Sequence, residues 1–382
     1  MRTFRQLLLL ALMPLLAALT ACSDDDSASG GSEPPVEGEA AECSAPGIST
    51  EDITDETPAE TADPEPFEAD PALDGESITL YSGRDLELIQ PIIDRFSEVT
   101  GIDVEIRDGD SSEMAAQLLE EGDSTPADVF YSQEVGATGV LAKADLLSEL
   151  PDEIIEQVDE RFRPGSDNAW VGVTGRTRVI AYNPELVEER PDCVLALTDE
   201  QYRGDVAIVP SNAGFKAFMT GFRVQEGDDE ARAWLEAMGA NEAITEFESN
   251  GDVLDAVDAG DVPIGLINHY YWARSENRDT LNAQLVFPTG DDPGGLVNAT
   301  AVGVMAGSAD DPASLALVEY LLSAEGQTTF VEETYEYPVV DGVADPEGVP
   351  PLDELEGPAL DLTDLDSLEE TEAMLTDMGL LN

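Results

Sequence analysis

The segment from Ser77 to Gly342 alternates short apolar runs with amphipathic ones, and this order restricts the folds open to the chain. A run with strand character, "SITLYSG", precedes "LELIQPIIDRFSEVTG", whose apolar residues recur at helical spacing. Further apolar runs, separated by helical patterns, are "ADVFY", "RVIAYN", "VAIVPSN" and "VPIGLIN". Strands that alternate with helices predict an α/β fold with mostly parallel sheets. The segment is long enough for two lobes.

More specific sequence signals predict the positions of two helices. "DSSEMAAQLLEEG" begins at Asp110, has Glu113 at the third position and ends at Gly122, which predicts a helix between Asp110 and Gly122. The last residues, about 351–382, end in an amphipathic pattern, which predicts a C-terminal helix packed on one lobe.

The first 22 residues have the three parts of an export signal. Arg2 and Arg5 form a basic start, an apolar core covers Leu7–Leu19, and "LTAC" ends at Cys22. The small residue before the cysteine resembles the lipobox of bacterial lipoproteins, which implies cleavage before Cys22 and a diacyl anchor on its thiol. The alternative is an ordinary signal peptide with a coincidental cysteine. We expect an extracytoplasmic protein, lipid-anchored to the cell membrane.

Residues 23–76 are rich in Asp, Glu, Pro, Ser and Gly, with almost no large apolar side chains. This composition predicts a disordered, self-repelling tether. The predicted organisation is a signal peptide at 1–22, a tether at 23–76, a first lobe at 77–177 plus about 298–350, and a second lobe at 178–297 plus about 351–382.

The chain has 83 acidic and 17 basic residues, and its formal net charge is −66. Nucleic-acid binding needs clustered Lys and Arg, so this charge argues against it. Because the acidic residues are dispersed, we favour adaptation to a salty habitat over a cation-handling surface.

Motifs of enzyme chemistry are absent from the sequence. It has no G-x-x-x-x-G-K, no G-x-S-x-G, and a single histidine, His269, so it is not predicted to be an enzyme. Export would permit a disulfide between Cys43 and Cys193, but the sequence does not fix their geometry, and their spacing gives no zinc motif. An exported two-lobed chain without catalytic motifs suggests the solute-binding protein of an importer.

A set of segments, in order along the chain, then matches one family. They are "LYSGRD", "LLEEGDSTPADVFYSQE", "GRTRVIAYNPEL", "LTDEQYRGDVAIVPSNAGF", "ESNGDVLDAVDAGDVPIGLINHYYW" and "VNATAVGVMAGSADDPASLALVEYLLSAEGQTTF". Over about Ile78–Val340 the chain resembles the ferric-ion-binding proteins of bacterial ABC importers. The resemblance implies a two-lobed type II periplasmic-binding fold with a ligand cleft between the lobes. It also implies a monomer that captures Fe³⁺ by lobe closure and delivers it to a membrane permease and its ATPase.

The segment "GDVPIGLINHYYW" contains two adjacent tyrosines, Tyr270 and Tyr271. Adjacent side chains of a strand point to opposite faces, so two phenols can converge only where the strand ends. The family places its tyrosine pair at such a strand end, and the resemblance implies that Tyr270 and Tyr271 ligate iron. Fe³⁺ prefers oxygen donors and drives off the phenol proton. An isolated "YYW" would favour simple core packing. His269 stands at a non-ligand position and is expected to be structural.

The first-lobe ligands differ from the family pattern. In the best-known members a histidine follows "Y-x-G-x", where this chain has Asp85, and a glutamate is usual where it has Gln133. One carboxylate and two phenolates still neutralise Fe³⁺, so we expect Asp85 to be a ligand. Glu134 is a further candidate, although a solvated carboxylate at a helix start is equally plausible for it.

The family completes the iron shell with a synergistic anion, such as phosphate, carbonate or citrate. "PSNAGF" falls at an expected helix N-terminus, whose free N–H groups favour anions, although Asn before a helix is often only a cap. The residues that the resemblance assigns to the anion are Asn212, Ala213, Gly214, Asn250, Asn268 and Arg176.

Asp85 and Gln133 leave room for another small ligand of an importer, such as an organic anion or a polyamine. A catalytic lipoprotein and an acidic adhesion lipoprotein are alternatives from other classes. Colour separates these hypotheses, because only an iron–tyrosinate complex absorbs visible light.

Overall fold

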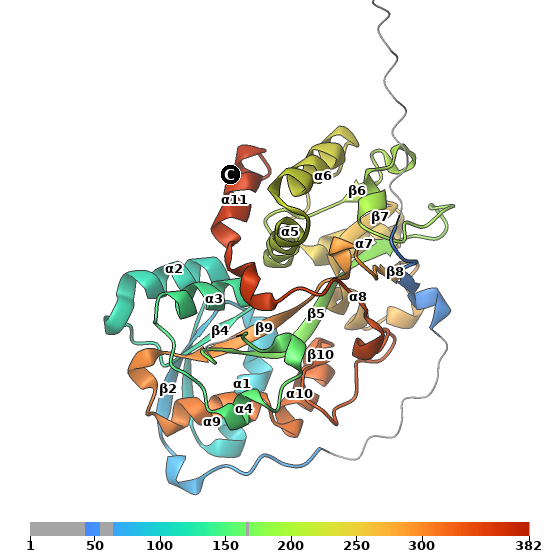
Figure 1. Cartoon of the computed structure of the whole chain (residues 1–382). Coiled ribbons are helices and arrows are strands. Elements are labelled where there is room, and N and C mark those ends of the chain that lie inside the picture. The colour runs from blue at the N-terminus through green and yellow to red at the C-terminus, as the bar shows by residue number, and fades with distance from the viewer. Residues whose placement is uncertain (1–42, 54–63, 166–167, 382) are drawn as a thin grey trace, which may run out of the picture. The chain divides into compact units, whose positions relative to one another are not determined.

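The computed structural model describes residues 43–53, 64–165 and 168–381 (Figure 1). These residues belong to one compact unit, Ala40–Asn382. The predicted signal peptide and the lipidation site Cys22 lie outside the described residues. No helix of the described part has the length and apolar composition of a membrane span.

The described strands form one mixed sheet around the long strand β5. The strand order is β1-β8-β5-β9-β4-β2-β3, while β7 and β10 also pair with β5, and β6 pairs with β7. The bounds are β1 (Ile48–Ser49), β2 (Ser77–Ser82), β3 (Asp103–Asp108), β4 (Val129–Ser132), β5 (Val171–Tyr182), β6 (Val206–Ala207), β7 (Ile264–Asn268), β8 (Gln284–Phe287), β9 (Val297–Val304) and β10 (Tyr337–Pro338).

The prediction of mostly parallel pairing is wrong. Parallel pairs join β2 to β3 and β4, and β6 to β7. All four neighbours of β5 run antiparallel to it, and β4 is antiparallel to β9. The reason is that β5 crosses the sheet: its first part pairs with β9 and its second part pairs with β7 and β8.

Helices pack around the two parts of the sheet on either side of this crossing. We call β2, β3 and β4 with α1, α2, α3, α9 and α10 the β2 half, and β6, β7 and β8 with α5, α6 and α7 the β7 half. The helix bounds are α1 (Leu86–Thr100), α2 (Ser111–Glu121), α3 (Val135–Lys143), α4 (Asp152–Ile155), α5 (Ala213–Glu226), α6 (Asp228–Ala240), α7 (Asn250–Ala259), α8 (His269–Ala273), α9 (Pro312–Leu321), α10 (Ala324–Thr334) and α11 (Leu368–Asp377). Helix α2 confirms its prediction, because the Asp110 side chain accepts from the N–H of Ser112 and Gly122 follows the last turn.

Parts of the predicted tether, residues 23–76, are ordered, so the prediction of disorder is wrong for them. Cys43 forms a disulfide with Cys193, and β1 pairs with β8. Further along, the ring of Phe67 packs edge-on against Tyr320, with 5.5 Å between the ring centroids. Composition does not reveal this order, because the contacts are made to residues far away in the sequence.

The C-terminal segment contacts both halves of the sheet, where a single lobe was expected. Helix α11 packs on α5, while the 3₁₀ helix η11 (Leu362–Asp366) lies against α3 (Figure 1). Leu365 and Leu375 are buried in two separate core clusters. The segment therefore links the β2 half to the β7 half.

Candidate metal and anion site

Tyr270 and Tyr271 lie where β7 gives way to α8. The strand ends at Asn268, as the prediction requires, and both tyrosines fall in the first turn of the short helix. Their rings stack with centroids 4.7 Å apart and planes inclined by 27°. Tyr270 is fully buried and Tyr271 is partly buried. Two adjacent phenols thus share one location at the end of a strand.

Burial favours the protonated form of the Tyr271 phenol unless a cation is present. The pKa of Tyr271 is raised above its ordinary value, first by burial and then by Tyr270 and by the negative charge of Asp85. A bound trivalent ion would reverse this effect, because it stabilises the phenolate directly. Among the described residues, no three side chains of the His, Cys, Asp and Glu types gather as a metal site. The phenol oxygens of Tyr270 and Tyr271 are therefore the candidate metal ligands at the end of β7.

Arg84 provides a fixed positive charge beside the pair. Its Cζ lies 5.5 Å from the ring centroid of Tyr270, and its Nη2 lies 3.0 Å from Oε2 of Glu336. Both side chains of this ion pair are fully buried, although the guanidinium is not aligned for a hydrogen bond. Burial lowers the pKa of Arg84, but Glu336 and the surrounding phenols outweigh it and raise the pKa above its ordinary value. Arg84 therefore stays charged.

The two predicted first-lobe ligands have different surroundings. Asp85 precedes α1, is exposed and makes no capping hydrogen bond within the described part of the chain, and its charge acts on Tyr271. Glu134 caps α3, where its Oε2 accepts from the N–H of Gly136 at 2.7 Å. Glu134 is buried, which raises its pKa, and its Oε1 has no hydrogen-bond partner among the described residues. It is a helix-start carboxylate, as considered above, but not a solvated one.

Most residues predicted for the anion come together next to Tyr270. Asn212 caps α5 and accepts from Nδ2 of Asn250, the first residue of α7, at 3.2 Å. Nδ2 of Asn268 lies 3.4 Å from the Tyr270 hydroxyl. Gly214 is so close to Asn268 that a Cβ at residue 214 would lie 2.7 Å from Nδ2. The first turn of α5, which begins at Ala213, thus faces the strand end that carries the tyrosines.

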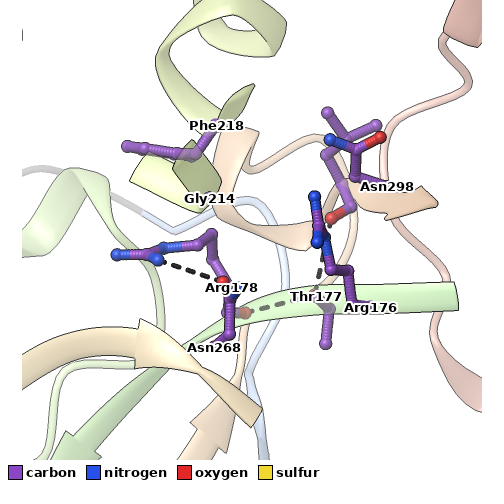
Figure 2. Close-up of a pocket in the computed structure, with 8 residues that line it drawn as sticks. Arg176, Thr177, Arg178, Gly214, Phe218, Asn268 and Asn298 are labelled. Atoms are coloured by element: carbon purple, nitrogen blue, oxygen red, sulfur yellow. Dashed lines mark hydrogen bonds between the residues drawn. The ribbon is translucent and has the colours of Figure 1, made fainter. Parts of the chain in front are cut away.

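Arg176 lines a small pocket between β5 and α5 together with two other residues predicted for the anion, Gly214 and Asn268 (Figure 2). Arg178 lines the same pocket and donates to Oδ1 of Asn268 at 3.0 Å. Burial lowers the pKa of Arg178 to about 9. Sequence reasoning gave no role to Arg178, although "GRTR" places it on the same strand face as Arg176.

His269 is structural, as predicted. It is fully buried, stacks on Tyr337 with ring centroids 4.7 Å apart, and its Nε2 lies 3.0 Å from the carbonyl oxygen of Tyr335. Burial lowers the pKa of His269 to about 3, so the ring is neutral at ordinary pH.

The fold and this arrangement define an extracytoplasmic solute-binding protein. A family model described as bacterial extracellular solute-binding protein matches residues 124–358, and the chain belongs to this family. It is 32% identical over 321 residues to the Fe(3+)-binding periplasmic protein of Serratia marcescens, a match that covers 82% of this chain and 94% of that protein.

Solved structures support the same assignment. Iron-bound HitA from Pseudomonas aeruginosa is 32% identical, with a TM-score of 0.74, and the match covers 80% of this chain and 99% of HitA. The Trichodesmium protein IdiA (FutA), in complex with iron and citrate, is 25% identical, with a TM-score of 0.68 and coverage of 80% and 100%. The chain therefore has the expected two-lobed type II periplasmic-binding fold.

Proposed function

We propose that this chain is the ferric-ion-binding lipoprotein of an ABC importer. It captures Fe³⁺ with an anion by lobe closure and delivers the ion to a membrane permease and its ATPase. It acts as a monomeric binder without catalysis, and a lipid on Cys22 holds it at the cell membrane. Relatives that are named for ferric iron support the cargo.

The observation that carries the proposal is the stacked tyrosine pair at the end of β7. Phenolate oxygens are hard donors that suit a trivalent cation. Arg84 and Arg178 are buried cations that act on these phenols, so each favours the ionised form of a tyrosine. Tyr270, Tyr271 and Asp85 form the proposed ligand set. Glu134 could join it only by giving up its cap on α3.

The anion belongs at the first turn of α5. The N–H groups of Phe215 and Lys216 are bonded to Asn212, which leaves those of Ala213 and Gly214 for the anion. Asn250 and Asn268 approach the same place from α7 and β7. The buried Oδ1 of Asn250 has no hydrogen-bond partner in the described part of the chain, so it could accept from a protonated anion such as bicarbonate or hydrogen phosphate. Phosphate, carbonate and citrate are the proposed anions.

A second candidate ligand is a small organic anion without iron. The specific observation in its favour is the concentration of three buried arginines, Arg84, Arg176 and Arg178, around this region. The same arginines disfavour a polyamine, because like charges would meet in the interior.

The test is a titration of the purified protein with ferric citrate, followed by visible absorbance. We expect a coloured complex whose band falls by most of its intensity in Tyr270→Phe and in Tyr271→Phe. We also expect the dissociation constant to rise by more than about 100-fold, because losing a charged ligand costs more than the about 1–3 kcal/mol of an unmet hydrogen bond.

Tyr320→Phe is the matched control. Tyr320 is fully buried, and its hydroxyl has no hydrogen-bond partner among the described residues, so this variant should keep the colour and the affinity. If the parent protein stays colourless and binds an organic anion, that anion and not iron is the ligand. If either tyrosine variant binds Fe³⁺ as tightly as the parent, that residue is not a ligand.

A further inference from the structure

Lys216 extends from α5 of the β7 half to the β2 half. Its Nζ donates to Oγ of Ser112 at 3.3 Å and lies 3.7 Å from Oδ2 of Asp110, both at the start of α2. It also donates to Oε1 of Glu372 at 2.8 Å, in α11, which packs on α5. A second hydrogen bond crosses the same boundary, from Oγ of Ser112 to Glu372 at 3.2 Å. These four residues form one polar network between the two halves.

The side chain of Lys216 is enclosed by the two halves. It is only 10% exposed, so solvent screens its charge much less than it screens a surface ion pair. Burial lowers the pKa of Lys216, but the hydrogen bond to Glu372 and the charges of Asp110 and Glu134 outweigh it and raise the pKa above its ordinary value. Lys216 is therefore charged. Without the ammonium group, the carboxylates around it would repel one another across the boundary.

Both ends of this network are attached to the proposed binding site. Lys216 lies in the first turn of α5, which begins at Ala213 and is the proposed place of the anion. In α2, Oγ of Ser111 donates to the carbonyl oxygen of Gly83 at 3.1 Å and accepts from the N–H of Gln133 at 2.9 Å. The loop of Gly83 carries the proposed first-lobe ligand two residues later. The network thus joins the anion-binding turn to the loop of that ligand.

We propose that Lys216 is a latch of lobe closure, which holds the β7 half against the β2 half and slows the escape of the bound ion. The nature of the cargo rests on the proposed function, whereas the contact between the halves does not. Opening has to separate α5 from α2, and this separation breaks the contacts of Lys216 with Ser112 and Asp110. Because capture is proposed to occur by lobe closure, a smaller population of the closed form weakens binding in proportion.

The first test measures the separation of the halves in the iron-free protein. Spin labels are attached to Leu119→Cys in α2 and to Leu186→Cys beside the end of α7, at side chains that are 44% and 48% exposed. Double electron–electron resonance then gives the distribution of distances between the labels. We expect Lys216→Met to move this distribution to longer distances than in the parent, because methionine keeps an apolar stem but removes the charge.

Lys143→Met is the matched control. Lys143 is the other lysine of the chain and also pairs with the C-terminal segment, through Asp366. That contact joins α3 to η11 and involves no residue of the β7 half, and the lysine side chain is 67% exposed. This variant should keep the distance distribution of the parent.

Asp110→Asn tests the partner of the latch on the β2 half. Asparagine caps a helix about as well as aspartate, so α2 keeps its first turn while the charge that faces Lys216 is lost. We expect a shift in the same direction as in Lys216→Met, but a smaller one, because Ser112 still accepts from the ammonium group. The double variant should open no further than Lys216→Met alone, since both changes act on one contact.

The second test uses the iron-loaded protein. Loss of the visible band after addition of excess EDTA gives the rate at which iron leaves. We expect this rate to rise by at least about tenfold in Lys216→Met and by less than about twofold in Lys143→Met, because truncating a partner of a buried charge pair acts mainly on dissociation.

Two results would overturn the latch. One is a distance distribution of Lys216→Met that equals that of the parent, and the other is an unchanged rate of iron loss in this variant. A parent protein that takes up no iron would contradict the proposed function instead, and the distance measurement would still decide about the latch. If Lys216→Met does not fold, the distance distribution of Asp110→Asn decides, and an unchanged distribution there would also overturn the proposal.

Discussion

Arg84 and Glu336 meet in the interior, where solvent does not screen their charges. Glu336 also accepts hydrogen bonds from Thr174 at 3.0 Å and from Thr334 at 3.3 Å, so the carboxylate is fixed from two sides. Buried ion pairs seldom add much net stability, because both charges give up their hydration. The pair is better understood as a way to keep one positive charge beside Tyr270, where it favours the phenolate.

Replacing Glu336 by Gln should leave Arg84 as a buried charge without its partner. We expect the free energy of unfolding to fall by about 3–5 kcal/mol, measured by urea denaturation. The control is Glu98→Gln, in the exposed pair that Glu98 forms with Arg95, where we expect a change of at most about 1 kcal/mol. Equal effects of the two substitutions would show that the buried charge is balanced by other groups.

The sequence allowed only some of these residues to be assigned. Tyr270 and Asn268 are within two positions of each other, so one short segment predicts them together. Arg84 and Glu336 lie at opposite ends of the folded chain, and no local pattern indicates that they meet. Asp85 and Glu134 remain predictions as ligands, and the structure adds that, within its described part, Asp85 makes no capping hydrogen bond while Glu134 caps a helix.

Elements were predictable where their signals are local. Helix α2 begins and ends at the residues that its caps indicate, and α11 forms where the amphipathic pattern places it. The direction of β5 relative to its neighbours was mispredicted, because strand pairing depends on the path of the whole chain. The order of β1 was missed for a similar reason: its partner β8 lies more than half the chain away.

The apolar face of α11 gives an element-scale prediction. Leu375 is fully buried in a core cluster with residues of α5 and α6, so Leu375→Ala should lower the free energy of unfolding by about 2–5 kcal/mol in urea denaturation. Leu186→Ala, at a side chain that is 48% exposed, should change it by less than about 1 kcal/mol. If the two variants are equally stable, α11 does not contribute to the core of the β7 half.

At the scale of the whole molecule, the C-terminal segment spans the two halves with charges as well as apolar contacts. The chain has only two lysines, and each pairs with this segment. Lys143 of α3 pairs with Asp366, and Lys216 of α5 donates to Glu372 at 2.8 Å. Lys216 also lies 3.7 Å from Asp110 at the start of α2. In a chain with a net charge of −66, these pairs place the scarce positive charges where the β2 and β7 halves meet.

The disulfide gives a prediction at the same scale. Cys43 and Cys193 are 150 residues apart, so their bond closes a long loop in the unfolded chain. Reduction should lower the free energy of unfolding by about 2–5 kcal/mol, which thermal unfolding with and without a reductant would measure. A variant with serine at both positions should have the melting temperature of the reduced protein, and the reductant should not change it. Unchanged melting of the parent protein after complete reduction would contradict this prediction.

If a lipid on Cys22 anchors the protein, as proposed, the same bond limits the distance between the folded part and the membrane. If the lipid is attached to Cys22, as proposed, residues 23–42 are the length of chain between the anchor and the disulfide at Cys43. Twenty residues reach about 70 Å at full extension. A molecule confined to a hemisphere of that radius has a local concentration on the order of 1 mM at its anchor point. Cys193 lies in the chain that leads from β5 into the β7 half, so the disulfide connects the N-terminal segment to that half. A permease beside the anchor would then meet its binding protein at a local concentration in the millimolar range.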